Sequence, residues 1–220
     1  MSGVQAAPPP PIPIDFIGDV ASARCFIGLR LIDSVVRSVP GLSVEVRWRP
    51  FQIDPGLPAS GVDRATYLIE RWGSENQARE ALQDMQAEAN EFGLKFAFDR
   101  IRRQPNTFEA HRLIRYARNF GVEMQLIEAM FMAFFTEGRD IGDRAILLTL
   151  GAHCGVDPEL AEAFLRLGDD VEPLRQELSG FRSLGVDAAP RFIIAGRETL
   201  PGLVPAEDFA EALFRAVEED

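Results

Sequence analysis

The start of the chain alternates between two hydrophobic patterns, and this alternation limits the fold more than any other feature. Residues 12–17 form a short apolar run typical of a strand. Residues 26–39 carry apolar side chains at a helical period and end before Pro40-Gly41. Residues 42–48 then alternate apolar and polar side chains, as a strand does. A strand, a helix and a strand in so short a stretch predict a βαβ unit with parallel strands.

The end of the chain returns to strand patterns. Residues 191–195 form a short β run, Gly196-Arg197 is a turn signal, and residues 198–200 can pair back as a hairpin. An amphipathic helix is predicted over residues 205–217. Between the two ends almost every segment has a helical pattern.

The order βαβ, helices, ββα is that of a thioredoxin-like α/β fold that carries an all-helical insertion. We expect residues 12–61 and 185–220 to form the thioredoxin-like domain and residues 62–184 to form the helical insertion domain. Residues 1–11 are small and rich in proline, which predicts a flexible tail.

The segment Ser22-Ala23-Arg24-Cys25 lies between the first predicted strand and its helix. Two cysteines at this spacing would form a redox centre of the thioredoxin kind. The first thiol would sit at a helix N-terminus, where the free N–H groups stabilise a thiolate, and the second thiol would resolve the mixed disulfide. A serine hydroxyl is a weak nucleophile without an adjacent base, so Ser22 cannot make this attack.

The charge of the chain excludes some classes of partner. The 220 residues carry a net charge of −11, which disfavours nucleic acid and anionic membrane surfaces. No apolar run approaches the roughly 20 residues that cross a bilayer, and the N-terminus does not look like a secretory signal. Two unpaired cysteines suit a reducing compartment, so we expect a cytoplasmic protein. The widely separated histidines and cysteines predict no metal site.

Several segments outside the SxxC motif resemble one known family. The matching segments are residues 19–28, 46–51, 105–107, 110–113, 135–143, 185–186 and 189–192. They resemble the DsbA family, and within it the FrnE-like thioredoxin-fold oxidoreductases. This group neighbours the kappa-class glutathione transferases and the 2-hydroxychromene-2-carboxylate isomerases.

The resemblance implies a cytoplasmic thiol-disulfide oxidoreductase, and a homodimer is compatible with it. The sequence departs from the family at the motif, where Ser22 replaces the first cysteine and Ala23-Arg24 replace Pro-Trp. Impaired dithiol exchange is therefore the first hypothesis, with no cofactor required.

The motif leaves other functions open. Ser22 can be a plain helix cap and Cys25 a core thiol, or Cys25 can act alone as a monothiol or redox sensor. The related isomerases and transferases imply that Ser22 donates a hydrogen bond to the thiolate of bound glutathione, so a glutathione-dependent isomerase or transferase is an alternative. A third hypothesis is a non-catalytic protein that binds an extended peptide or a small molecule.

The resemblance supplies further candidate binding residues. Pro190 matches the cis-proline of thioredoxin folds, and the preceding residue, Ala189, would offer its backbone to a peptide or to glutathione. Asn106 and His111 lie in a segment that faces the active-site cleft in the family. Local rules explain Asn106 equally well as a helix cap and His111 as a core residue. Arg24 stands beside the motif and could bind a carboxylate.

Overall fold

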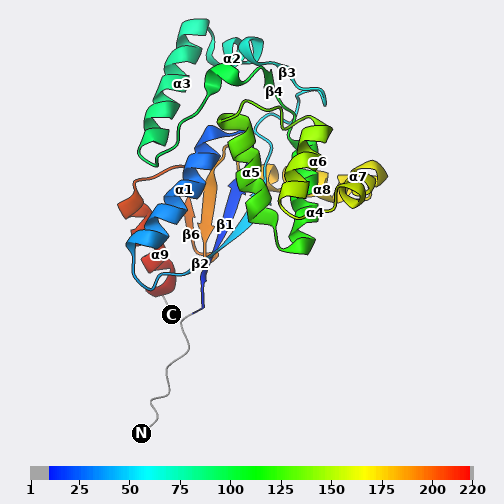
Figure 1. Ribbon diagram of the computed structural model, residues 1–220. Coiled ribbons are helices and arrows are strands. Elements are labelled where there is room, and N and C mark those ends of the chain that lie inside the picture. The colour runs from blue at the N-terminus through cyan, green and yellow to red at the C-terminus, as the bar shows by residue number, and fades with distance from the viewer. Residues whose placement is uncertain (1–9, 219–220) are drawn as a thin grey trace.

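The computed structural model describes residues 10–218 and shows one mixed sheet surrounded by helices (Figure 1). The sheet has the order β2-β1-β5-β6. Its strands are β1 (Ile12–Gly18), β2 (Val44–Pro50), β5 (Arg191–Ile194) and β6 (Glu198–Leu200). The central strand β1 is parallel to β2 and antiparallel to β5, and β5 and β6 form the predicted hairpin. The thioredoxin-like fold is confirmed.

The long helices join the two halves of the sheet and cover it. They are α1 (Ala23–Ser38), α2 (Arg64–Trp72), α3 (Glu75–Asn90), α4 (Phe108–Ala117), α5 (Glu123–Phe135), α6 (Arg144–His153), α7 (Pro158–Leu167), α8 (Val171–Ser183) and α9 (Ala206–Glu218). Several begin at a side chain that accepts a backbone N–H, as helix caps do: Ser22, Asp63, Ser74, Asp143 and Asp157.

Most of the helices between α1 and α9 fall into two groups, and α5 lies beside α1 (Figure 1). Helices α2 and α3 lie above the end of the sheet at which β1 finishes and α1 begins. Helices α4, α6, α7 and α8 gather at one side of the molecule. The predicted helical insertion is confirmed, and its two groups flank the N-terminus of α1.

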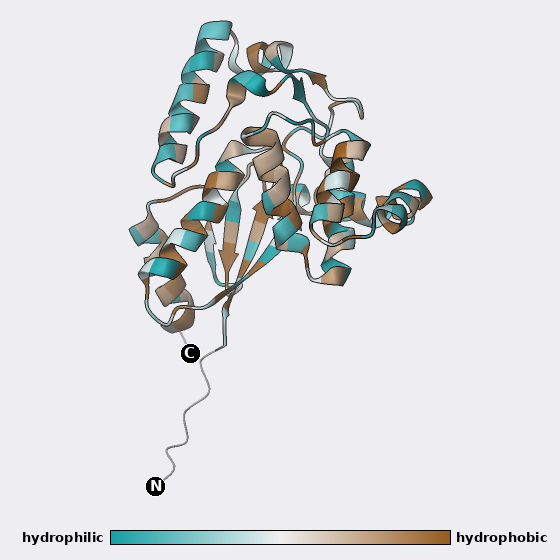
Figure 2. Ribbon diagram, viewed as in Figure 1, coloured by the Kyte–Doolittle hydropathy of each residue, from teal (hydrophilic) through white to brown (hydrophobic). Residues whose placement is uncertain are grey.

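Aromatic side chains make one core of the sheet and the insertion. Phe16 of β1 packs against Trp48 of β2 and Phe192 of β5, with ring centroids 5.2 and 4.8 Å apart. Phe26 of α1 stacks on Phe131 of α5 at 4.9 Å. All five side chains are almost completely buried. Figure 2 shows the brown, apolar strands at the centre and the mainly hydrophilic α3 outside. The start of α1 is therefore held by a shared core.

The insertion also contains a short strand pair that its helical patterns do not predict. Strand β3 (Val62–Asp63) pairs with β4 (Arg103–Gln104), which follows the short 3-10 helix η1 (Phe98–Arg100). Gly61 precedes β3 with a φ of 66°, and a Cβ atom there would collide with the carbonyl oxygen of Gln104. Glycine thus allows the close approach that fixes the start of α2 over the sheet.

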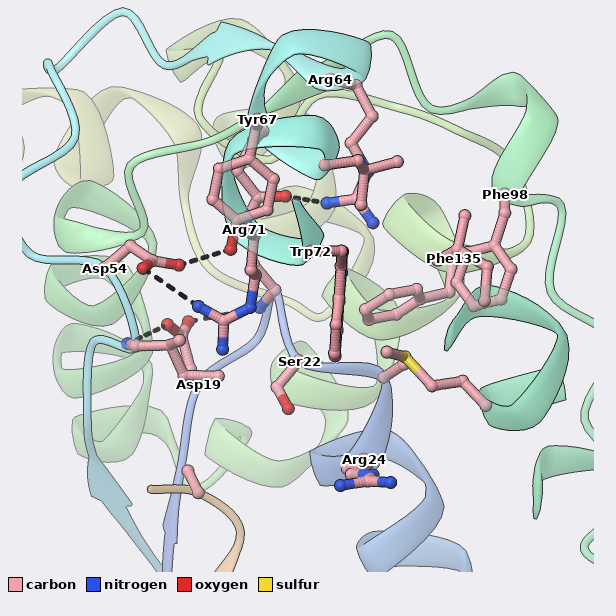
Figure 3. Close-up of a pocket in the computed structure, with 18 of the residues that line it drawn as sticks. Asp19, Ser22, Arg24, Asp54, Arg64, Tyr67, Arg71, Trp72, Phe98 and Phe135 are labelled. Atoms are coloured by element: carbon pink, nitrogen blue, oxygen red, sulfur yellow. Dashed lines mark hydrogen bonds and ion pairs between the residues drawn. The ribbon is translucent and has the colours of Figure 1, made fainter. Parts of the chain in front are cut away.

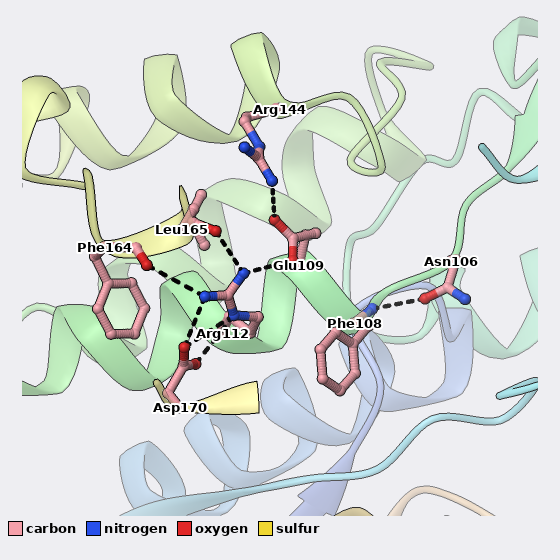
Figure 4. Close-up of polar contacts among 8 residues, drawn as sticks. All are labelled: Asn106, Phe108, Glu109, Arg112, Arg144, Phe164, Leu165 and Asp170. Carbon is pink, nitrogen blue, oxygen red and sulfur yellow. Dashed lines mark hydrogen bonds and ion pairs between the residues drawn. The ribbon is translucent and has the colours of Figure 1, made fainter. Parts of the chain in front are cut away.

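A buried arginine ties α4 to the turn between α7 and α8 (Figure 4). Arg112 is 2% exposed, and its guanidinium donates to Asp170 at 2.7 Å and to Glu109 at 2.8 Å. It also donates to the carbonyl oxygens of Leu165 and Phe164 at 2.8 and 3.2 Å. Because every side of the charge has a partner, the interaction fixes how these helices meet.

Part of the predicted N-terminal tail lies outside the described residues, which begin at Pro10; Pro10 and Pro11 are exposed and belong to no helix or strand. Within residues 10–218, no helix combines the length and the apolar character needed to cross a membrane.

Candidate functional site

Ser22 caps the N-terminus of α1, where β1 ends. Its backbone is extended, with φ −102° and ψ 116°, and its hydroxyl oxygen accepts a hydrogen bond from the N–H of Cys25 at 3.3 Å. The side chain is largely buried but lines a cleft. A hydroxyl hydrogen rotates to suit its acceptor. Ser22 can therefore serve both the helix and a ligand that enters the cleft.

Cys25 lies one turn further along α1 and is completely buried. The backbone N–H of Asp19 donates to its sulfur at 3.5 Å. Burial raises the pKa of the thiol from 9.0 to about 12, and this outweighs the neighbouring Ser22 side chain and Asp19 backbone, which lower it. The one sulfur of the motif is therefore a protonated thiol without access to a substrate.

We expect iodoacetamide to leave Cys25 unmodified in the folded protein, even when the pH is raised from 8 to 10, because the thiol stays protonated and buried. Cys154, which is only partly buried, should be alkylated first. Mass spectrometry of peptides after timed labelling measures both sites, and labelling in denaturant is the control in which both react. Alkylation of native Cys25 as fast as Cys154 would contradict the assignment.

A buried polar pair lies behind the motif. The Asp19 carboxylate accepts the N–H of Ile53 at 2.8 Å and the N–H of Ala21 at 3.2 Å. His111 Nε2 lies 3.6 Å from Asp19 Oδ1 and 3.1 Å from the carbonyl oxygen of Phe51. Since a carbonyl only accepts, Nε2 carries a hydrogen. His111 is 1% exposed and does not line the cleft, so it supports the loops that hold Ser22.

The cleft above Ser22 has a volume of about 210 Å³ and lies between the α1 N-terminus and helices α2 and α3 (Figure 3). One side is polar: the Tyr67 hydroxyl donates to Asp54 at 2.6 Å, and Arg71 lies 3.5 Å from the same carboxylate. Burial, followed by the bond to Asp54, raises the pKa of Tyr67. The opposite side is aromatic, formed by Trp72, Phe98 and Phe135.

Arg64, at the start of α2, brings a positive charge to this cleft. Its guanidinium donates to the side-chain oxygen of Gln104 and lies over the Tyr67 ring, 5.6 Å from the centroid. Within residues 10–218 it has no carboxylate partner. Burial, and the nearby charge of Arg71, lower its pKa to about 10, so it remains a cation at neutral pH. A half-buried cation of this kind favours an anionic ligand.

A larger hollow of about 750 Å³ adjoins the cleft, and Arg24, Ala188 and Ala189 line both. The Ala189-Pro190 bond is cis, as predicted, and Pro190 lines the larger hollow. Arg24 is exposed and donates to both carboxylate oxygens of Glu88 on α3, at 2.9 and 3.3 Å. Ligands longer than the cleft can thus extend past Arg24.

Asn106 lies apart from the cleft. Its side chain donates to the carbonyl of Leu57 at 2.7 Å and accepts from Gln52 at 3.0 Å and from the N–H of Phe108 at 2.9 Å. It lines a third hollow instead.

The structure therefore brings Ser22, Arg24 and Ala189 together at the cleft, with Pro190 in the adjoining hollow. The sequence did not single out Arg64 or Tyr67, because nothing local marks a residue that a distant strand pair carries over the cleft.

In the part of the chain that the structure describes, no group of three or more histidine, cysteine, aspartate or glutamate side chains could hold a metal ion.

The sequence matches the model of the DSBA-like thioredoxin domain family over residues 13–214. The chain belongs to this family. It is also 25% identical to the uncharacterized protein YwbO of Bacillus subtilis over 201 residues, which cover 91% of this chain and 94% of YwbO. It is therefore a DsbA-like thioredoxin-fold protein of the oxidoreductase family.

Solved structures agree with this placement. A probable DsbA oxidoreductase of Streptomyces coelicolor superposes with a TM-score of 0.86 and 26% identity, covering 95% of this chain and 91% of that one. A 2-hydroxychromene-2-carboxylate isomerase gives a TM-score of 0.68 at 18% identity, over 92% and 95% of the chains. The structure of the cytosolic disulfide reductase DsbM of Pseudomonas aeruginosa with GSH gives a TM-score of 0.62 at 21% identity, covering 94% of this chain and 99% of that one. At these lower identities the last two show the fold alone.

Proposed function

We propose that this protein binds a small-molecule thiol of the glutathione type in the Ser22 cleft and stabilises its thiolate, and that it does not carry out dithiol exchange. The observation that carries the proposal is the contrast within the motif: Ser22 lines the cleft, whereas Cys25 is a buried, protonated thiol. A reacting sulfur must then come from the ligand. The DsbM structure with GSH supports a small thiol as the ligand, and the 2-hydroxychromene-2-carboxylate isomerase is an example of this fold in an isomerase.

The α1 N-terminus is suited to the proposed thiolate. The free N–H groups of the first helical turn and the helix dipole favour a negative charge there. The Ser22 hydroxyl adds a donor whose hydrogen can turn toward the sulfur while its oxygen keeps the bond from Cys25 N–H. A bound thiol would thereby lose its proton more readily than it does in water.

The cleft can also recognise the rest of such a ligand. Glutathione carries two carboxylates, and Arg64 presents a guanidinium that has no carboxylate partner within residues 10–218. The cleft is small, but the ligand can continue past Arg24 and Ala189 into the adjoining hollow. Among the described residues, the backbone N–H and C=O of Ala189 make no hydrogen bond within the protein. They are thus available to the peptide backbone of the ligand.

Titration of the wild-type protein with glutathione by calorimetry tests the proposal and should show one site at millimolar concentration or below. Arg64→Gln should weaken binding roughly tenfold or more, since a hydrogen bond to a charged group contributes about 1.5–3 kcal/mol. Arg79→Gln is the matched control, because Arg79 lies on the exposed face of α3 beside Glu75. Absence of binding to the wild type, or equal binding by both variants, would contradict the proposal.

A peptide-binding protein is the second candidate, favoured by the size and lining of the larger hollow. Ile27, Leu31, Phe92, Leu203 and Val204 give it apolar walls beside Ala189. Extended peptides can pair with a free backbone in such a groove. Fluorescence anisotropy with labelled apolar peptides separates the two functions: binding of peptides without binding of glutathione would favour this candidate.

The proposed ligand implies where the protein acts. Millimolar reduced thiol is a property of a reducing compartment, and the structural relative DsbM is described as cytosolic. We therefore include a cytoplasmic location in the proposal.

A further inference from the structure

A groove of about 660 Å³ lies between the start of α4 and the helix α8, on the far side of residues 52–55 from the Ser22 cleft. Arg144, Arg175 and Arg182 line it together with Phe108, Asn106 and Ser179. We call it the arginine groove. Ile53 and Asp54 line the cleft, whereas Gln52 and Pro55 line the arginine groove, so one short segment separates two distinct hollows.

The charges around the arginine groove do not balance. Glu109 accepts from Arg144 at 2.7 Å and also from the buried Arg112, which is paired in turn with Asp170 (Figure 4). These two arginines and two carboxylates neutralise one another. Arg175 and Arg182 remain, and neither has a carboxylate partner within residues 10–218. Two positive charges are therefore left at one hollow of a protein with a net charge of −11.

Both unpaired guanidinium groups are nevertheless held in place. Arg175 lies over the Phe108 ring, 5.7 Å from its centroid, and Arg182 lies over the Phe51 ring at 4.7 Å. Arg182 also donates to the backbone carbonyls of Gln52 and Ile53. Rings and carbonyls orient a guanidinium without neutralising its charge. The remaining N–H donors can then form paired bonds with an oxyanion.

We propose that the arginine groove is a second binding site, for a small ligand that carries a doubly charged oxyanion, either a phosphate monoester or a pair of carboxylates. Arg175 and Arg182 bind the anion, and Ser179 and Asn106 offer polar atoms beside it. The volume lies in the usual range of about 300–1,000 Å³ for small-molecule sites. The site does not depend on thiol binding, because the segment 52–55 stands between the two hollows.

Calorimetric titration with pyrophosphate and with succinate, at low ionic strength, tests this site. We expect one site per chain for at least one probe. Tighter binding of pyrophosphate identifies a phosphate-type ligand and tighter binding of succinate a dicarboxylate. Arg175→Gln and Arg182→Gln should each weaken binding roughly tenfold or more. High salt should weaken binding too, because the groove is open to solvent.

Arg166→Gln is the matched control: Arg166 is exposed on α7, outside the groove, and has no carboxylate partner in the described part of the chain. This variant and Ser22→Ala should both bind the probe as the wild type does. If Arg182→Gln unfolds, Arg175→Gln still decides, since Arg175 makes no hydrogen bond or ion pair within residues 10–218 and lies over the Phe108 ring. No binding of either probe at millimolar concentration, or unchanged binding in Arg175→Gln, would overturn the proposal.

Discussion

Ser22→Cys is expected to create a disulfide reductase. The rate of insulin reduction should rise at least on the order of a hundredfold above the wild-type rate, because removing the nucleophile of an enzyme usually lowers its rate by more than this factor. The new thiol would stand at the α1 N-terminus, lining the cleft, where its thiolate is stabilised. Cys25, three residues on, would resolve the mixed disulfide. The turbidity of reduced insulin in the presence of dithiothreitol measures the gain.

Ser22→Ala is the control, since it removes the hydroxyl without adding a thiol and should remain at background. Wild-type turnover close to that of Ser22→Cys would contradict the view that Cys25 cannot exchange by itself. A Ser22→Cys variant that is folded but inactive would mean that the cleft no longer admits a disulfide substrate.

Arg112→Met is expected to lower the free energy of unfolding by about 3–5 kcal/mol, the usual cost of removing one partner from a buried ion pair. The variant leaves the Asp170 carboxylate, which is largely buried, and the carbonyls of Leu165 and Phe164 without their donor. Urea denaturation followed by circular dichroism gives the difference.

Arg115→Met is the matched control on the same helix. Arg115 is paired with Glu177 at 3.0 Å, but its side chain is 37% exposed, so the change should cost less than about 1 kcal/mol. Equal losses in the two variants would show that the buried network contributes no more than a surface ion pair.

The elements of the fold were predictable because their signals are local. The strand patterns at 12–17 and 191–195 and the helical period after Cys25 each reflect the burial of apolar side chains in the core. The pair β3–β4 was not predicted, because two-residue strands carry no periodic signal and form through a contact between Gly61 and Gln104.

The candidate site was predictable only in part, for the same reason. Ser22 and Pro190 follow from motifs, but Arg64 and the Tyr67–Asp54 bond depend on where β3 and α2 lie in space. The placement of His111 behind the cleft depends on the distant carbonyl of Phe51. Sequence spacing carries no information on such contacts between segments far apart in the chain.

The pKa of the thiol of bound glutathione tests the central claim most directly. The thiolate absorbs in the ultraviolet, so a pH titration of the saturated complex, compared with free glutathione and with the protein alone, yields this value. We predict a pKa at least about one unit below that of the free thiol, because the helix N-terminus and Ser22 stabilise the charge. Ser22→Ala should move the value back toward that of free glutathione. A titration of the bound ligand that coincides with free glutathione would contradict the account.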